Sequence, residues 1–370
     1  MKGGPGRLST SGLRDDPSQA SAAKRLAVVA GAGGVVGKSL TRKLVSEGWE
    51  VVGLSRRQLD IPGARWVGVD LVDVADCVAK LSLVSDATHL FCSARYNFDE
   101  GGREPLEENL AIVRNVVEVL DSAAPELRHI HLVQGMKYYG SHIGPFMTPA
   151  REHHPRSLVP NFYYLQQDYL QARQHNARWT WSASRPDALI HAEAGIPRNL
   201  VSVIAVYALL CRELGQPFSF PGTHAAFNAL YQVTSTDHLV AGLAWMSEST
   251  VAANQAYNMV NGDYIRWANL WPVFARYFDV EPGPVRPFSL AEAMADKGPV
   301  WERIARRHEL TPAPFANLAH WGYADYIWSR GWDVMADMTK ARLHGFVRAV
   351  DTETEFLRYF GALKAQRIIA

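Results

Sequence analysis

Hydrophobic and polar positions along this chain alternate between two patterns, one typical of strands and one typical of helices. From residue 24 onward, short runs of apolar and β-branched residues alternate with longer stretches in which apolar residues recur at helical spacing. The runs that predict strands are 25–31, 49–56, 64–71, 87–94, 127–135 and 179–190, and the stretches that predict helices between them include 35–48, 106–123 and 159–171. Strands separated by helix-length segments indicate right-handed crossovers and a doubly wound parallel sheet with helices on both faces.

The pattern loosens after residue 190. A long apolar helix is predicted over residues 200–214, followed by loops and two tryptophan-rich stretches. One of these, residues 267–278, is interpreted first as the core face of a helix and second as a pocket wall. We therefore divide the chain into a dinucleotide-binding domain of Rossmann type (24–190) and a smaller, mainly helical substrate-binding portion (191–370) that is interleaved with the sheet.

The composition indicates a folded protein rather than a charged or disordered one. The chain of 370 residues is 48% hydrophobic and 11% aromatic, with a formal net charge of +1. These values favour neither a nucleic-acid partner nor a membrane-surface partner, and no apolar run is long enough to cross a membrane. The first 23 residues are rich in glycine, serine and charge without an apolar centre, so we expect a flexible tail and not a secretory signal.

The cysteines and histidines predict no metal site. Cys77, Cys92 and Cys211 are far apart in the sequence and lie inside apolar runs, which is typical of buried, reduced thiols. His153 and His154 are adjacent in a loop and lack the spacing of metal ligands. We expect a cytoplasmic protein, and the sequence leaves a homodimer open.

A glycine-rich turn follows the first predicted strand. Its sequence, AGAGGVVG (30–37), places three glycines at three-residue spacing between a strand and a helix. Such glycines permit a tight turn, a close approach of the backbone to a pyrophosphate, and close packing of helix on strand. The start of the helix then offers free N–H groups to phosphates. The cofactor-binding candidates at this turn are Gly31, Gly34, Val35, Val36 and Gly37.

The end of the second strand indicates the type of dinucleotide. NAD binders usually carry an acidic residue there, whereas this chain has Ser55, Arg56 and Arg57. An arginine at this point can neutralise the 2′-phosphate of NADPH, and the alternative is a solvated pair of arginines. Asp70, after the third strand, is a candidate for the adenine edge or for the N-cap of the next helix. Ser93, after the fourth strand, is a further cofactor candidate.

The predicted helix 159–171 begins with two adjacent tyrosines, Tyr163 and Tyr164. A short-chain dehydrogenase usually places a lysine one helical turn after its catalytic tyrosine. None of the 14 tyrosines in this chain has a lysine four residues later. Either the chemistry of such an enzyme is lost, or the lysine comes from another element.

A lysine is available just past the fifth predicted strand. Lys137 follows that strand at the carboxyl edge of the sheet, where open α/β sheets bind their ligands. The tyrosine helix must return along the same edge, so Lys137 can approach Tyr163. Its ammonium would favour the tyrosinate or stabilise negative charge on a substrate oxygen. The alternative is an ordinary loop lysine beside a half-buried helix tyrosine.

Four motifs together resemble those of the progesterone 5β-reductase/iridoid synthase family, an atypical branch of the extended short-chain dehydrogenases. The family pattern is GxxGxxG, ARR after the second strand, GxKHYxGPF, and NFYYxxED. This chain has GAGGVVG, SRR, GMKYYGSHIGPF and NFYYLQQD. The resemblance implies NADPH-dependent reduction of a carbon–carbon double bond conjugated to a carbonyl, with hydride added to the β-carbon. By position in the motifs, it implies that Tyr163 and Lys137 stabilise the resulting enolate.

The chain also departs from the family pattern. Gln167 stands where the family has the first residue of an acidic pair, and Arg95 stands where plant members have a pocket-lining tryptophan. If Arg95 faces the pocket, an anionic or strongly polar substrate is favoured over a bare steroid; if it faces solvent, it carries no such information. Tyr164 is a further candidate for substrate contact, as is Phe227 by its position in the family alone.

Two other functions remain open from the sequence. A carbonyl reductase on the same scaffold would use Tyr163 to protonate an alkoxide. A catalytically silent NADP-sensing protein would keep the nucleotide site without turnover, although such proteins usually lose the tyrosine–lysine pair.

Overall fold

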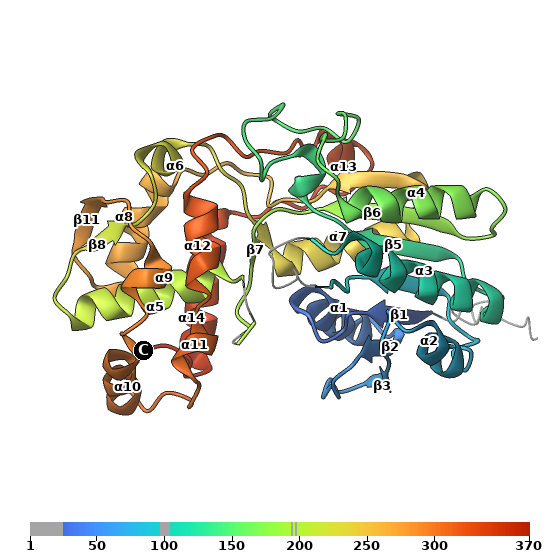
Figure 1. Cartoon of the computed structure of the whole chain (residues 1–370), viewed down its shortest axis with the longest axis horizontal. Helices are drawn as coiled ribbons and strands as arrows, with labels where there is room; N and C mark the ends of the chain where they lie inside the picture. Colours follow the sequence, from blue (N-terminus) through green and yellow to red (C-terminus); the bar gives the residue numbers. More distant parts are fainter. Residues whose placement is uncertain (1–24, 97–103, 194, 197) are drawn as a thin grey trace, which may run out of the picture.

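The computed structural model describes residues 25–96, 104–193, 195–196 and 198–370. Its centre is a seven-stranded sheet of parallel strands in the order β10-β6-β5-β4-β1-β2-β3 (Figure 1). These strands are β1 (Leu26–Ala30), β2 (Glu50–Ser55), β3 (Ala64–Gly68), β4 (His89–Cys92), β5 (His129–Val133), β6 (Thr180–Arg185) and β10 (Gln255–Asn258). The predicted Rossmann-type, doubly wound parallel sheet is thus confirmed.

Helices cover both faces of this sheet (Figure 1). One face packs against α1 (Val35–Ser46) and α7 (Thr236–Glu248), and the other against α2 (Val74–Leu81), α3 (Leu106–Ala123) and α4 (Phe162–Gln174). Strand β1 shows why the sequence reveals these strands: all five of its residues are buried, and they alternate between the two core clusters. A strand buried on both faces must be apolar throughout.

The sheet differs from the prediction at its β6 side. Residues 179–190 were predicted as one strand, but β6 ends at Arg185 because Pro186 has no N–H to continue the ladder. The chain resumes as β7 (Leu189–Ile190), which pairs with β9 (Thr234–Ser235) in a separate two-stranded sheet. Strand β10 was not predicted at all. It returns from the second half of the chain to pair with β6, so residues beyond 190 supply both α7 and β10 to the Rossmann layer.

The second half of the chain builds a mainly helical portion beside the sheet (Figure 1). It contains a two-stranded sheet of β8 (Phe218–Phe220) and β11 (Pro282–Val285). The remaining elements of the chain are η1 (Met136–Tyr139), α5 (Leu200–Glu213), α6 (His224–Asn228), η2 (Thr250–Ala252), α8 (Trp267–Phe278), α9 (Leu290–Ala293), α10 (Gly298–Arg307), α11 (Phe315–Leu318), α12 (Trp321–Trp328), α13 (Thr339–Leu343) and α14 (Thr352–Ala365). Among the helices of the described ranges, none combines the length and apolar character that a membrane span requires.

Aromatic side chains form the core of this helical portion. Trp271 of α8 stacks on Phe218 of β8 with ring centroids 4.3 Å apart, and its edge meets Trp328 of α12 at 5.4 Å. Trp267 and Phe274 of the same helix are also buried in this cluster. The tryptophan-rich stretch therefore forms core, as its first interpretation had it, because the large apolar faces of α5, α8 and α14 close over one another.

Two buried histidines link β5 to β6. His131 shares hydrogen bonds with the hydroxyls of Ser182 (2.7 Å) and Ser184 (3.0 Å), and His129 with those of Thr180 (2.9 Å) and Ser182 (2.7 Å). Burial lowers the pKa of His131 to about 3 and holds the pKa of His129 well below its ordinary value of 6.5. Both imidazoles are therefore neutral in the folded protein at neutral pH.

We expect these histidines to destabilise the fold in mild acid. The unfolded chain protonates each of them below pH 6.5, whereas the folded chain does so only near pH 3 for His131, so stability is lost as the pH falls through that window. Within that window, each histidine lowers the free energy of unfolding by about 1.4 kcal/mol for each pH unit of acidification. When urea unfolding is measured from neutral to mildly acidic pH, the free energy of unfolding should fall less steeply for His131→Gln than for the wild type. Parallel pH dependences of the two proteins would contradict this account.

Candidate active site

A cavity of about 1040 Å³ opens at the carboxyl ends of the parallel strands. Its walls include residues that directly follow β1, β2, β3, β4, β5 and β6. In doubly wound sheets this edge is where ligands bind. The helical portion closes the other side with side chains such as Arg198, Tyr323 and Arg330. The volume lies at the upper end of the range of about 300–1,000 Å³ for single-ligand pockets, which leaves room for a dinucleotide and a second molecule.

The glycine-rich turn forms one end of the cavity. Gly31 has a φ of +84°, and a Cβ there would lie 2.5 Å from the backbone nitrogen of Ala94. A Cβ on Gly37 would collide with the carbonyl oxygen of Gly31, so this glycine serves the packing of helix on strand. Gly34 is the N-cap of α1 and provides no side-chain cap, and the first turn holds no acidic residue. Gly31, Gly34, Val35 and Val36 line the cavity, where the N-terminus of α1 can accept phosphate.

The arginine motif lies along the same end of the cavity. Ser55, Arg56 and Arg57 all line it, and the hydroxyl of Ser55 donates to the carbonyl oxygen of Arg57. The two arginine side chains are exposed and can fold over a ligand. Ser93 also lines the cavity, and its hydroxyl donates to the carbonyl oxygen of Ala30 (2.9 Å).

Asp70 lines this part of the cavity as well, but it does not cap the following helix. The N-cap of α2 is Asp73, whose carboxylate accepts from the N–H groups of Ala75 (2.8 Å) and Asp76 (3.2 Å). The N-cap interpretation of Asp70 was therefore wrong. The carboxylate of Asp70 instead accepts from the N–H of Val72 (3.1 Å) within the turn.

The two adjacent tyrosines point to different places. Tyr163 lines the cavity and is buried. Its hydroxyl lies against Gly135: a Cβ added to this glycine would be 3.2 Å from the hydroxyl oxygen. The hydroxyl of Tyr164 instead donates to the carbonyl oxygen of Tyr138 (2.6 Å) and accepts from the N–H of Ser157 (2.8 Å). Tyr164 is not among the residues that line the cavity. The prediction of substrate contact by Tyr164 is therefore not supported, because its hydroxyl is engaged by the backbone elsewhere.

Lys137 enters the cavity from η1, the short helix that begins after Gly135, two residues beyond the end of β5. Its ammonium donates to the Glu104 carboxylate (3.1 Å). Burial lowers the pKa of Lys137, and Glu104 acts in the opposite direction. Asn161 couples this lysine to the tyrosine: its amide donates to the carbonyl oxygen of Lys137 (3.2 Å), and its oxygen accepts from the N–H of Tyr163 (3.0 Å).

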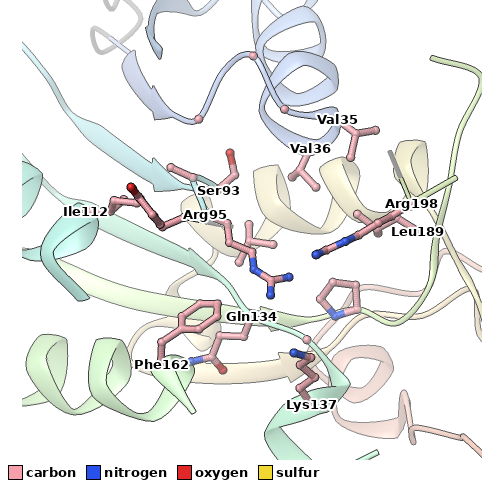
Figure 2. Close-up of a pocket in the computed structure, with 18 of the residues that line it drawn as sticks. Val35, Val36, Ser93, Arg95, Ile112, Gln134, Lys137, Phe162, Leu189 and Arg198 are labelled. Carbon is pink, nitrogen blue, oxygen red and sulfur yellow. The ribbon is translucent and has the colours of Figure 1, made fainter. Parts of the chain in front are cut away.

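Arg95 faces the cavity, which is the first of the two positions considered for it, and the anionic or polar substrate that this position favours stays a prediction. Figure 2 shows its guanidinium extending between Val36 and Lys137. It donates to the same Glu104 oxygen as Lys137, at 2.8 Å, and lies 5.6 Å from the ring centroid of Phe162. Phe227, by contrast, packs against Phe220 in the helical portion and is not among the residues that line the cavity. Its predicted substrate contact is not supported, because α6 directs the ring into the aromatic core.

Comparison with known proteins matches this arrangement to one family. Residues 55–370 match the profile of the PRISE-like Rossmann-fold domain. The chain belongs to the PRISE-like family. The motif resemblance is thereby confirmed.

Curated relatives match this PRISE-like chain over nearly its full length. An (S)-8-oxocitronellyl enol synthase from Camptotheca acuminata is 33% identical, with 93% of each chain covered. A 3-oxo-Δ4,5-steroid 5β-reductase from Arabidopsis thaliana is 30% identical, with 96% of this chain and 95% of the relative covered. A short-chain dehydrogenase from Penicillium aethiopicum is also 30% identical, with 93% and 99% covered. These relatives confirm the prediction of an oxidoreductase of the short-chain dehydrogenase/reductase superfamily.

Solved structures share the fold at much lower identity. A short-chain dehydrogenase/reductase superfamily protein from Agrobacterium tumefaciens, with bound NAD, superposes with a TM-score of 0.65 at 13% identity, covering 93% of this chain and 98% of that one. The UDP-glucose 4-epimerase of Thermus thermophilus gives a TM-score of 0.65 at 14% identity, covering 92% and 99%.

Several residues of the PRISE-like site were not predicted from the sequence. Glu104, which bridges Arg95 and Lys137, and Asn161, which couples Lys137 to Tyr163, are visible only once the chain is folded. Asp187 lines the cavity and lies 3.8 Å from Arg330, which is 6% exposed and reaches in from beyond α12. The one available signal was the position of Asp187 just after β6, at the ligand-binding edge.

Gln167, which replaces the acidic residue of the family motif, lies beneath the site. Arg185 of β6 is fully buried and donates to Gln167 (3.3 Å), to Gln134 (3.1 Å) and to the Tyr139 hydroxyl (2.7 Å). Gln134 in turn donates to the carbonyl oxygen of Tyr163 (3.2 Å). The departure at Gln167 thus exchanges an expected carboxylate for a neutral acceptor in the network that supports the tyrosine helix.

Proposed function

We propose that this protein uses NADPH to reduce the carbon–carbon double bond of an α,β-unsaturated carbonyl compound. The observation that carries the proposal is the placement of Tyr163 and Lys137 on one cavity from two different elements. Lysine placed one turn after tyrosine on a helix serves proton relay in ordinary short-chain dehydrogenases. Here Lys137 is held instead by Glu104 and shares that carboxylate with Arg95, which suits stabilisation of negative charge.

The residues at the glycine end fit a dinucleotide phosphate. The uncapped N-terminus of α1 offers N–H groups and partial positive charge to a pyrophosphate. Arg56 and Arg57 line the same end and carry the charge and fork geometry that a 2′-phosphate requires. When bound, the reduced nicotinamide would supply a hydride for the β-carbon of the substrate.

The protonation state of Tyr163 suits an enolate better than an alkoxide. Burial raises the pKa of Tyr163 to about 12, and Arg95 acts in the opposite direction. The hydroxyl is therefore protonated at neutral pH and can donate a hydrogen bond to the carbonyl oxygen of the substrate. As negative charge grows on that oxygen, this bond strengthens, and the nearby cations stabilise the charge in a site of low dielectric. An enolate is a weaker base than an alkoxide, so it can persist without taking the proton of Tyr163. The hydrogen bond from Tyr163 and the charge of the nearby cations are what stabilise it.

The relatives supply independent support. The 3-oxo-Δ4,5-steroid 5β-reductase is named for the reduction of a ring double bond conjugated to a ketone. The chain retains Tyr163 and Lys137 on the cavity, which a protein that only senses NADP would not need.

The proposal is tested by comparing two substrates that differ only in the double bond. NADPH oxidation is followed with a cyclic enone and with the corresponding saturated ketone. We expect turnover of the enone, with the saturated ketone as product, and no turnover of the saturated ketone. Faster consumption of the saturated ketone would assign carbonyl reduction. Binding of NADPH without turnover on a broad enone panel would assign a sensor.

We expect the paired substitution Arg56→Ala/Arg57→Ala to remove the preference for NADPH. Each charge-assisted hydrogen bond to a phosphate contributes about 1.5–3 kcal/mol, so the Kd for NADPH should rise at least about tenfold while the Kd for NADH stays nearly unchanged. Arg65→Ala provides the control, because Arg65 is an exposed arginine on the neighbouring strand β3 and is not among the residues that line the cavity. Equal loss of both nucleotides in the double variant would show that the arginines do not read the 2′-phosphate.

A further inference from the structure

The substrate end of the cavity concentrates positive charge. Among the described residues that line it there, Arg95, Lys137, Arg198 and Arg330 are cationic, whereas Asp187 is the carboxylate. Figure 2 shows Arg95 and Arg198 entering from opposite walls, with their guanidinium groups directed into the same space above Lys137. One wall is the segment after β4, and the other is the segment that leads into α5. This convergence spans two halves of the chain, so it is a property of the fold and not of one loop.

These cations influence one another and Tyr163. Burial lowers the pKa of Arg198, and the charge of Arg95 lowers it further. Burial is also the first cause of the lowered pKa of Lys137, and both arginines add to it. The same two arginines pull the pKa of Tyr163 down against the effect of its burial. Like charges held together in a partly buried site are unfavourable, and such arrangements occur where a ligand supplies the opposite charge.

Carboxylates of the protein lie beside three of these cations. Glu104 is shared by Arg95 and Lys137, at 2.8 and 3.1 Å, and Asp187 lies 3.8 Å from Arg330. On the proposed function, the phosphates of the dinucleotide bind at the N-terminus of α1 and at Arg56 and Arg57, which line the other end of the cavity. On the wall opposite Arg95, the guanidinium of Arg198 is directed into the same space as that of Arg95, where the two together can receive a second anion.

Resting on the proposed function, we propose that the enone reduced by this protein carries a carboxylate, which Arg198 and Arg95 receive beside Tyr163. A planar guanidinium matches the two oxygens of a carboxylate in a forked hydrogen bond. Arg95 and Arg198 together make this end of the cavity cationic. A carboxylate so placed would orient the conjugated carbonyl toward the Tyr163 hydroxyl.

The test uses an acid and its neutral isostere as matched substrates: 3-(3-oxocyclohex-1-enyl)propanoate and the corresponding primary amide. We expect wild-type kcat/KM to favour the acid by about 100-fold, because only the acid presents a charged, forked partner to the two guanidinium groups. Arg198→Gln should lower kcat/KM for the acid at least about tenfold more than it lowers kcat/KM for the amide. Arg198→Lys, which keeps the charge but not the fork, should retain part of the preference.

Each outcome of this test has a defined meaning. Equal kcat/KM for acid and amide in the wild type would overturn the carboxylate inference while leaving enone reduction intact. Equal loss for both substrates in Arg198→Gln, together with a raised Kd for NADPH, would also overturn it and assign Arg198 to the cofactor. If neither compound turns over, calorimetric titration of both into the NADP⁺ complex decides: tighter binding of the acid supports the inference, and equal binding contradicts it.

Discussion

Replacing Tyr163 by phenylalanine is expected to lower kcat about 100- to 1000-fold, the usual effect of removing one hydrogen-bond donor to a developing oxyanion. The substitution keeps the aromatic ring and removes only the hydroxyl, which lies against Gly135. The pKa of about 12 keeps this donor protonated over the working range of pH. Steady-state kinetics with an enone measure the effect, and the Kd for NADPH should not change.

The neighbouring tyrosine provides the control. Tyr164→Phe removes the same atom one residue away, from a hydroxyl bonded to Tyr138 and Ser157 outside the cavity. We expect it to cost about 1 kcal/mol of stability and to leave kcat nearly unchanged. A Tyr163→Phe enzyme as active as Tyr164→Phe would remove Tyr163 from the mechanism.

Replacing Arg185 by methionine should produce the largest loss of stability. Its guanidinium is fully buried, donates to Gln134, Gln167 and the Tyr139 hydroxyl, and lies with its Cζ 3.4 Å from the ring centroid of Tyr138. Removing it leaves several buried acceptors without donors, so we expect the free energy of unfolding to fall by about 3 kcal/mol or more. Urea unfolding measures the change.

An arginine on the surface of α4 serves as its control. Arg173 is partly exposed and pairs with Glu118 and Asp121 at 3.3 and 3.0 Å, so Arg173→Met should cost no more than about 1 kcal/mol. Gln167→Glu should restore a carboxylate next to Arg185 and keep the protein at least as stable as the wild type. If Arg185→Met and Arg173→Met unfold at the same urea concentration, the buried network does not support the fold.

The parts of the fold that the sequence revealed are those with a local physical signature. Strand β1 is apolar throughout because both of its faces are buried, and the turn at Gly31 needs a positive φ. Strand β10 escaped prediction because its four residues, QAYN, include polar side chains and lie far along the chain from their partner β6. The end of β6 at Pro186 was a local signal that the long apolar run obscured.

The site was predictable to the extent that strand ends mark it. Arg56 follows β2 directly and Lys137 lies in the short segment after β5, so their place at the carboxyl edge follows from topology. The choice of Tyr163 over Tyr164 came from family resemblance alone, since both begin the same helix. Glu104 and Arg198 could not be inferred, because their roles depend on how distant segments meet over the cavity.

In the proposed reaction, the hydride is transferred to the β-carbon of the enone and not to the carbonyl carbon. The most direct measurement uses NADPH that carries deuterium at the transferred position, with a simple cyclic enone, and locates the label in the product by NMR. The account predicts deuterium on the β-carbon of a saturated ketone. Deuterium on the carbinol carbon of an allylic alcohol would contradict it and assign Tyr163 to alkoxide protonation.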